Sequence, residues 1–348
     1  MERRVDSGEP MNVQLMTRIL FATDFSNGAA RAQEYAVSLA MAWNADLDVL
    51  HVLEGTAWMP SSAASLSSLG QIHEDETPQL DEMQKLIVRN GVAATVHHVR
   101  GISSEQINVV AKECGADLVV LGQGQTPLDH ALPGSTAELV TKTAPCPVLA
   151  VRGFGEGVVR YPPQSPFSIQ HILAPVDFSS PALASLEYAI QFANRLGAKL
   201  TLLHVLEPVY HDLELGLGEI EQEPVKRAQW EAHLANLAAL ARSFGLQATS
   251  VVRGGIPSDS ILACALQKQC DLIVIGTHGR RGLSRERFGS VAGAVLRQAM
   301  CPVLTVRSPK FSPGYRGMIT ETAVEMGGEE HRSWPRGTFA SPSLTSPV

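Results

Sequence analysis

Short apolar runs alternate with longer segments of helical period along most of this chain. The runs are rich in β-branched residues and almost wholly apolar, which is typical of parallel strands covered by helices on both faces. In the second half, this pattern predicts strands at His171–Val176, Lys199–Val205, Gln247–Val252, Asp271–Ile275 and Pro302–Val306. It predicts helices near Pro181–Leu196, Glu221–Phe244, Ser258–Gln269 and Gly289–Ala299.

The first of these helices carries recognisable end signals. Ser180 followed by Pro181 is typical of an N-cap with proline at the first helical position. Gly197 is predicted to end the helix, because glycine adopts the left-handed conformation at a helix terminus without steric cost.

The same succession of elements occurs twice. The segment Arg18–Ser26 (RILFATDFS) matches His171–Ser179 (HILAPVDFS) at an offset of 153 residues. Similar matches continue at offsets of 154 and then 155, the last pairing Cys146-PVLAVR with Cys301-PVLTVR. Solenoid repeats have periods of about 20 to 50 residues, so this longer period indicates a duplicated domain. The predicted fold class is α/β, with two doubly wound domains, each a five-stranded parallel sheet with helices on both faces.

Composition shifts along the chain indicate where the two domains begin and end. The stretch GFGEGVVRYPPQSPFS is rich in Gly, Pro and Ser, as interdomain linkers are, and the C-terminal stretch has no hydrophobic period. We predict a flexible N-terminus at 1–16, domain 1 at 17–152, a linker at 153–168, domain 2 at 169–307 and a disordered tail at 308–348.

The overall composition excludes several classes of protein. A net charge of -7 and 5% aromatic residues argue against a nucleic-acid partner, which needs a basic surface and stacking rings. No apolar run approaches the roughly 20 residues that cross a bilayer, and the N-terminus lacks the apolar stretch of a secretory signal. Five cysteines without a CxxC pair form neither a disulfide framework nor a zinc site. We therefore expect a cytoplasmic protein without nucleic-acid or membrane partners.

The most informative motif follows the fourth predicted strand of domain 2. It reads G-x2-G-x9-G-S, from Gly276 and Gly279 to Gly289 and Ser290, with Arg280 and three further arginines inside the loop. Gly276 lets the chain leave the strand sharply, and Gly279 lets backbone amides approach an anion. Gly289 and Ser290 open the next helix, where free amides favour phosphate. Nucleotide binding is therefore the interpretation we favour over a solvated turn of glycine and arginine.

Other candidate residues recur in both copies at strand ends. Asp177 ends the first strand of domain 2, where its carboxylate can accept hydrogen bonds from a ribose or adenine group; the alternative is an Asx turn or helix cap. His51 and His204 are interpreted as buried, hydrogen-bonded imidazoles without a catalytic role. The recurring cysteines are interpreted as small core residues.

At these residues the chain resembles the universal stress protein family, specifically its tandem two-domain members. The likeness spans about Thr17 to Arg307. In that family the glycine motif binds ATP, with Mg²⁺ expected alongside, and the aspartate after strand one and the valine after the strand-two histidine contact the nucleotide. The resemblance implies that ATP is bound by Asp177, Val205, Gly276, Gly279, Gly289 and Ser290. Arg280 joins this predicted site because its charge can pair with phosphate oxygens. The resemblance also implies an internal pseudo-dimer through the fifth strands, and a homodimer of the chain is possible within the same family.

Domain 1 departs from this pattern. Its loop is one residue shorter in the first spacer, has Asp129 and contains no arginine. Charge-assisted hydrogen bonds to phosphate are therefore lost, and we expect weaker binding or none. The residues of this possible second site are Asp24, Val52, Gly122, Gly124, Gly134 and Ser135.

The leading hypothesis is an ATP-binding sensor or regulator in stress adaptation that acts through an unknown protein partner, with ATP held mainly by domain 2. Two alternatives stay open: a slow ATP-hydrolysing enzyme, and an interaction module without functional nucleotide binding. Against an enzyme, the sequence has no GK[ST] phosphate loop, no G-x-S-x-G elbow and no catalytic residue that we can assign.

Overall fold

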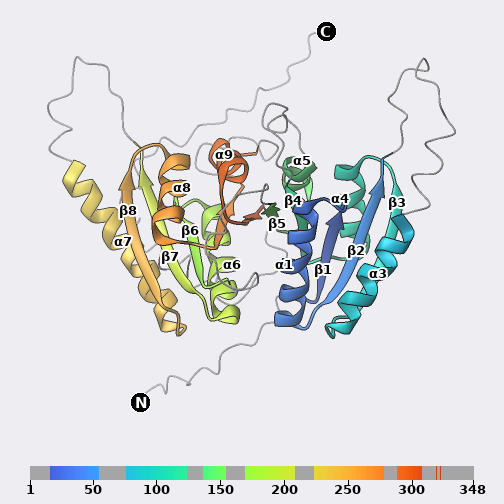
Figure 1. Ribbon diagram of the computed structural model, residues 1–348. Helices are drawn as coiled ribbons and strands as arrows, with labels where there is room; N and C mark the ends of the chain where they lie inside the picture. The colour runs from blue at the N-terminus through green and yellow to red at the C-terminus, as the bar shows by residue number, and fades with distance from the viewer. Residues whose placement is uncertain are drawn as a thin grey trace, which may run out of the picture.

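The computed structural model describes residues 16–54, 76–123, 136–153, 169–207, 223–277 and 288–307, together with Ile319 and Thr322. In domain 1 the chain forms β1 (Arg18–Thr23), α1 (Asn27–Trp43), β2 (Asp46–Leu53), α3 (Glu76–Arg89), β3 (Ala94–Arg100), α4 (Ser103–Glu113), β4 (Leu118–Gln123), α5 (Thr136–Thr143) and β5 (Val148–Arg152). Domain 2 repeats the order with β6 (His171–Pro175), α6 (Ser180–Leu196), β7 (Lys199–Leu206), α7 (Glu223–Ser243), β8 (Ala248–Gly254), α8 (Pro257–Lys268), β9 (Leu272–Gly276), α9 (Ser290–Gln298) and β10 (Val303–Val306). The two halves lie side by side (Figure 1).

The ten strands of the described residues belong to one sheet, in the order β3-β2-β1-β4-β5-β10-β9-β6-β7-β8. Neighbouring strands within each domain are parallel, and only β5 and β10 pair antiparallel, with Leu149 opposite Leu304. Two five-stranded parallel sheets thus join at their fifth strands. This confirms the predicted fold class and the internal pseudo-dimer, and it covers an edge of each sheet that would otherwise expose unpaired backbone groups.

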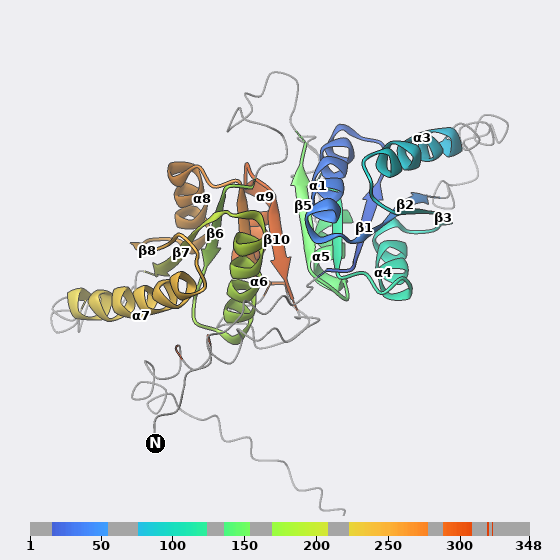
Figure 2. The ribbon, with the colours of Figure 1, turned by 90° about the horizontal axis from the view of Figure 1, so that it is seen from below.

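Helices cover both faces of the sheet. One core cluster lies beneath α1, α3, α6 and α7, and the other beneath α4, α5, α8 and α9. Seen from below, α1 and α3 lie on the other side of the domain 1 strands from α4 and α5, and α6 and α7 lie on the other side of the domain 2 strands from α8 and α9 (Figure 2). The strands contribute alternate residues to the two clusters, as expected for a sheet with two buried faces: Ile19 and Phe21 belong to the first cluster, whereas Leu20 belongs to the second. Ile319 also packs into the first cluster and is only 1% exposed, so the chain returns to the core after its last strand.

The ends of α1 and α6 show how local sequence fixes these elements. Both helices are capped by a serine, Ser26 on α1 and Ser179 on α6, whose side chain accepts a hydrogen bond from an amide of the first turn. The prediction of Ser180 as the α6 N-cap was wrong by one residue. Ser180 is itself helical, since Pro181 is tolerated at either of the first positions. Gly197 ends α6 at φ 66°, as predicted.

The joint between domains is made by helices as well as strands. The Trp43 ring of α1 packs against Phe192 of α6, with ring centroids 4.8 Å apart. Arg195 Nε donates to Ala42 O at 2.6 Å, so a cation of α6 caps the C-terminus of α1. Arg152, at the end of β5, donates to Ala299 O at 3.4 Å, next to the C-terminus of α9.

Candidate functional site

The candidate site lies where the strand order reverses in each domain. In domain 2 this is the boundary between β6 and β9, which pair in parallel, and in domain 1 the boundary between β1 and β4. The connections leave these neighbouring strands toward opposite faces of the sheet, so their carboxyl ends border the position where doubly wound folds bind ligands. Asp177 follows β6, and Gly276 ends β9, so the structure brings these two predicted residues to the same edge.

Backbone hydrogen bonds close the glycine loop of domain 2 at its base. Gly289 N donates to Thr277 O at 2.8 Å, and Thr277 N donates to Val306 O at 3.2 Å. Thr277 is fully buried. The first and last parts of the predicted motif therefore meet at the carboxyl edge of the sheet. Gly279 and Arg280 lie outside the described residues.

The helix that follows the loop begins at this meeting point. Its N-cap is Gly289, which has no side chain to accept a hydrogen bond from the first turn, in contrast to Ser179 on α6. Ser290, the first helical residue, is exposed. Backbone amides of a first turn combine with the positive end of the helix dipole, and together they favour an anion.

The structure gives a further reason for glycine at position 276, besides the sharp exit from the strand that the sequence suggested. A Cβ atom at this position would lie 2.9 Å from Pro181 O, and one at Gly122 would lie 2.5 Å from Ala29 N. Both glycines therefore let the first turn of α6 or α1 pack directly on the neighbouring strand. Packing is therefore a further reason for glycine at position 276, and the sharp exit from the strand stays a prediction. Gly124, Gly134 and Ser135 of domain 1 lie outside the described residues.

Asp177 and its counterpart Asp24 both form Asx turns. Asp177 Oδ1 accepts hydrogen bonds from Ser179 N at 2.9 Å and Ser179 Oγ at 2.5 Å, and Asp24 Oδ1 accepts one from Ser26 N at 3.0 Å. The structural alternative considered for Asp177 is thus present, and the turn fixes the carboxylate at the mouth of the strand pair. Nucleotide binding by either aspartate stays a prediction.

Beneath this corner of domain 2 lies an aromatic cluster that the sequence analysis missed. Phe178 has a φ of 62°, which is strained for a bulky residue, and its ring contacts His204 and Trp230 at centroid distances of 5.2 and 5.0 Å. His204 and Trp230 stack at 4.6 Å. The recurrence of Phe25 and Phe178 after the aspartates was the signal that could have revealed it.

The two recurring histidines are buried and hydrogen-bonded, as expected. His204 Nδ1 lies 2.7 Å from Val176 O, and His51 Nδ1 lies 2.8 Å from Thr23 O. Each imidazole thereby ties the end of its strand to the strand that carries the aspartate. Val205 and Val52 are half-buried on the opposite face, against the cluster beneath α4, α5, α8 and α9. Contact of these valines with adenine stays a prediction.

Thiol and metal chemistry find no support in the described residues. Burial raises the pKa of Cys264, and burial followed by the Asp48 charge raises that of Cys114, so both thiols stay protonated at neutral pH. Within the described ranges, no three His, Cys, Asp or Glu residues are grouped so that they could hold a metal ion. No helix in the described part of the chain is both long and apolar enough to cross a membrane.

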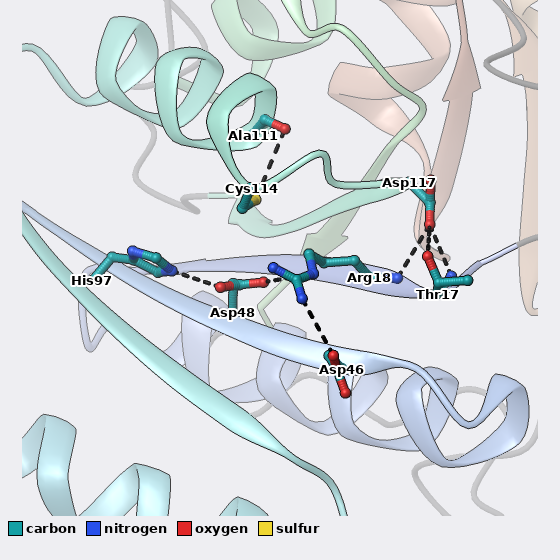
Figure 3. A network of polar contacts seen from close by, with 8 residues as sticks. All are labelled: Thr17, Arg18, Asp46, Asp48, His97, Ala111, Cys114 and Asp117. Atoms are coloured by element: carbon teal, nitrogen blue, oxygen red, sulfur yellow. Dashed lines mark hydrogen bonds and ion pairs between the residues drawn. The ribbon is translucent and has the colours of Figure 1, made fainter.

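A polar network occupies the opposite, amino-terminal edge of domain 1 (Figure 3). The buried Asp48 carboxylate contacts His97 Nε2 at 2.6 Å and Arg18 Nε at 3.7 Å. Nearby, Asp117 Oδ2 accepts hydrogen bonds from the backbone amides of Thr17 and Arg18. The network holds the first strand in the sheet, far from the strand ends that carry the glycine motifs.

Comparisons with known proteins agree with this geometry. The model of the universal stress protein family matches residues 16–152 and 168–307. A universal stress protein of Methanocaldococcus jannaschii is 34% identical over 141 residues, which cover 40% of this chain and 82% of that protein. One from Mycobacterium tuberculosis is 27% identical over 275 residues, 76% of this chain and 88% of that protein.

A solved structure supports the fold across both domains. The crystal structure of a universal stress protein from Archaeoglobus fulgidus superposes with a TM-score of 0.60 at 20% identity, covering 85% of this chain and 98% of that one. Two matches to the family model in one chain, and a relative that aligns across both, agree with the duplication seen in the sheet. This chain therefore belongs to the universal stress protein family, as a tandem member with two domains.

Proposed function

We propose that this protein binds ATP, mainly in domain 2, and acts as a nucleotide-dependent sensor or regulator in stress adaptation. The observation that carries the proposal is the hydrogen bond from Gly289 N to Thr277 O, 2.8 Å long, which brings both ends of the glycine motif together. It sets the amino end of α9 beside the pair of strands β6 and β9, of which β6 is followed by Asp177 and β9 ends in Gly276. An anion and a sugar hydroxyl then find partners at the same edge of the sheet.

The roles of the residues follow from their chemistry. Amides near Gly279 and Gly289, the Ser290 hydroxyl and Arg280 bind phosphate oxygens, since charge-assisted bonds to guanidinium groups are strong. Asp177 accepts hydrogen bonds from the ribose or the adenine amino group, and Val205 packs against the adenine ring. Mg²⁺ enters with the nucleotide, bound to its phosphate oxygens.

Domain 1 has a weaker site or none. Asp24 and Val52 keep their places, but its loop has Asp129 where phosphate would need cations. The protein then binds nucleotide in one of its two domains. A protein partner binds according to whether the site of domain 2 is occupied.

Calorimetric titration of the full chain with ATP and Mg²⁺ tests this proposal. We expect about one ATP per chain, and we expect Gly279→Asp to weaken binding on the order of 100-fold, since bulk and negative charge would enter the anion site. Gly124→Asp is the matched control and should leave the affinity unchanged. Loss of affinity in Gly124→Asp but not in Gly279→Asp would show that domain 1 holds the site, and no binding by the unaltered chain would refute the proposal.

Phosphate release in the same samples separates a sensor from an enzyme. A sensor with a single slow site should release phosphate far more slowly than one turnover per second, the low end of typical enzymes. Sustained turnover above that rate would favour the hydrolase alternative.

A further inference from the structure

The helices α5 of domain 1 and α9 of domain 2 meet across the joint between the domains. Glu138 on α5 is the centre of this contact: its Oε1 accepts a hydrogen bond from Lys142 Nζ at 2.8 Å, and its Oε2 one from Arg297 Nη1 at 3.3 Å. The Glu138 side chain is only 13% exposed. One carboxylate therefore holds a cation of its own helix and a cation of the other domain.

The charge of Glu138 is maintained despite its surroundings. Burial favours the neutral carboxyl, but the hydrogen bonds and charges of Lys142 and Arg297 outweigh it, so the pKa of Glu138 lies below its usual value. At neutral pH the group is a carboxylate. The carboxylate therefore pairs with the Lys142 ammonium group, whose side chain is 33% exposed.

The ammonium group of Lys142 lies over the ring of Phe288, 5.8 Å from its centroid. From α9 the same ring packs on Gly293, where a Cβ atom would approach Phe288 Cδ1 and Cε1 to 3.3 Å. The ring thus contacts a cation of domain 1 and a glycine of the helix that follows it in the chain. Phe288 is the residue directly before Gly289, the N-cap of α9.

The residues of this contact are not repeated in the other copy. At the offset of 155 residues, Glu138 corresponds to Gly293 and Phe288 to Pro133. Domain 2 therefore has no carboxylate, and domain 1 has no aromatic ring, at the equivalent position. Arg307 of domain 2 donates to Lys142 O, which ties the end of α5 to the second domain from the other side. Domain 1 therefore contacts the start of α9 through Lys142 and Phe288, whereas the described contacts of domain 2 with α5 come from Arg297 and Arg307.

We propose that Glu138 and Lys142 of domain 1 are positioning residues for the nucleotide site of domain 2, acting through Phe288 on the start of α9. This inference rests on the proposed function, because it assigns a role in ATP affinity to residues that do not touch ATP. A preorganised helix start binds an anion without first having to be ordered, so its support raises affinity. Domain 1 thereby contributes to nucleotide binding in domain 2, although its own loop contains no arginine.

Substitutions at Lys142 in the full chain test the inference, with Lys112 on α4 as the matched control. We expect Lys142→Met to weaken ATP binding about three- to tenfold, the range of a cation–aromatic contact. Lys142→Arg should restore the affinity, because guanidinium groups also bind ring faces, and Lys112→Met should change nothing. Equal binding by Lys142→Met and the unaltered chain would overturn the inference.

A double-mutant cycle separates positioning from simple loss of positive charge. Phe288→Leu leaves the charge of Lys142 in place and should weaken binding to a similar degree, while Lys142→Met adds little in the Phe288→Leu background. Fully multiplicative losses would show that Lys142 acts by charge alone and would contradict the proposal.

Hydrogen exchange without nucleotide separates this inference from the proposed function. Amides of residues 289–293 should exchange several-fold faster in Lys142→Met than in Lys112→Met. Faster exchange in a chain that binds no ATP would leave the positioning role intact and refute the proposed function. Unchanged exchange in a chain that binds ATP would overturn the positioning role.

Discussion

The two domains have the same backbone turns and hydrogen bonds at their strand ends, but the side chains around those strand ends differ. Asp24 and Asp177 form the same Asx turn, and His51 and His204 make the same hydrogen bond to the neighbouring strand. Around His204, however, Trp230 completes an aromatic cluster, whereas α3 of domain 1 contains no aromatic residue. The fold is thus maintained by groups common to both copies, and specialisation lies in side chains that only one copy has.

The largest effect is expected where helix and strand backbones are closest. A Cβ atom at Gly122 would lie 2.5 Å from Ala29 N, compared with 2.9 Å from Pro181 O at Gly276. We expect Gly122→Ala to destabilise domain 1 by about 3 kcal/mol and Gly276→Ala to destabilise domain 2 by about 1 kcal/mol, the span that overpacking usually covers. Native-state hydrogen exchange of strand amides reports each domain separately. A larger loss of stability in Gly276→Ala than in Gly122→Ala would show that α1 shifts away from its strand more easily than α6 does.

The next largest effect is expected in the aromatic cluster of Phe178, His204 and Trp230. Trp230→Leu removes the rings that stack on His204 and Phe178 and should cost domain 2 about 2 kcal/mol, less than full truncation of a buried aromatic residue. Met83→Leu on α3 is the control in domain 1 and should cost less than about 1 kcal/mol, since volume is conserved. Urea unfolding measures both. Equal costs would mean that the cluster adds nothing to domain 2.

Removing the aspartates separates the turn from the ligand contact. Asp177→Ala and Asp24→Ala both lose an Asx turn, but only Asp177→Ala should weaken ATP binding, by about tenfold, or roughly 1.4 kcal/mol. Calorimetry of the full chain compares the two variants. A loss of affinity shared by both would point to the turn itself, or to ATP in both domains.

The smallest effect is expected at the amino-terminal edges of the sheets, where Arg18 of domain 1 corresponds to His171 of domain 2. Burial lowers the pKa of His171 below 6.5, so the unfolded chain binds a proton more readily than the folded one. Domain 2 should lose stability as the pH falls below about 6.5 toward the folded value, and His171→Gln should flatten that dependence. Hydrogen exchange of domain 2 at pH 7 and pH 5 measures the difference. A steeper loss of stability with falling pH in His171→Gln than in the unaltered chain would contradict the predicted direction.

Much of the architecture could be predicted from the sequence because it depends on local and periodic signals. The strand predicted at His171–Val176 extends over His171–Pro175, and the helix predicted at Glu221–Phe244 over Glu223–Ser243. The pairing of the fifth strands followed from the family resemblance. The position of the N-cap was one residue off, because two adjacent serines offer the same chemistry to the helix end.

The contacts that distinguish the domains could not be predicted in this way. Lys142 meets Phe288 across the joint, and Trp230 meets His204 across a helix–sheet interface, so neither pair is close in sequence. No spacing rule connects such residues, because their proximity depends on how whole elements pack. Gly276 was found by its motif, but its close packing on the first turn of α6 was missed, since the neighbouring α6 backbone is not visible in the motif.

The antiparallel pairing of β5 with β10 has a further consequence for evolution. Two identical subunits joined by a twofold axis must carry every substitution twice, so a change that improves one pocket also alters the other. Covalent fusion removes that constraint, because each half mutates alone while the seam keeps them at a fixed one-to-one ratio. Specialised partners can therefore arise within a single polypeptide without the risk of pairing with the wrong subunit.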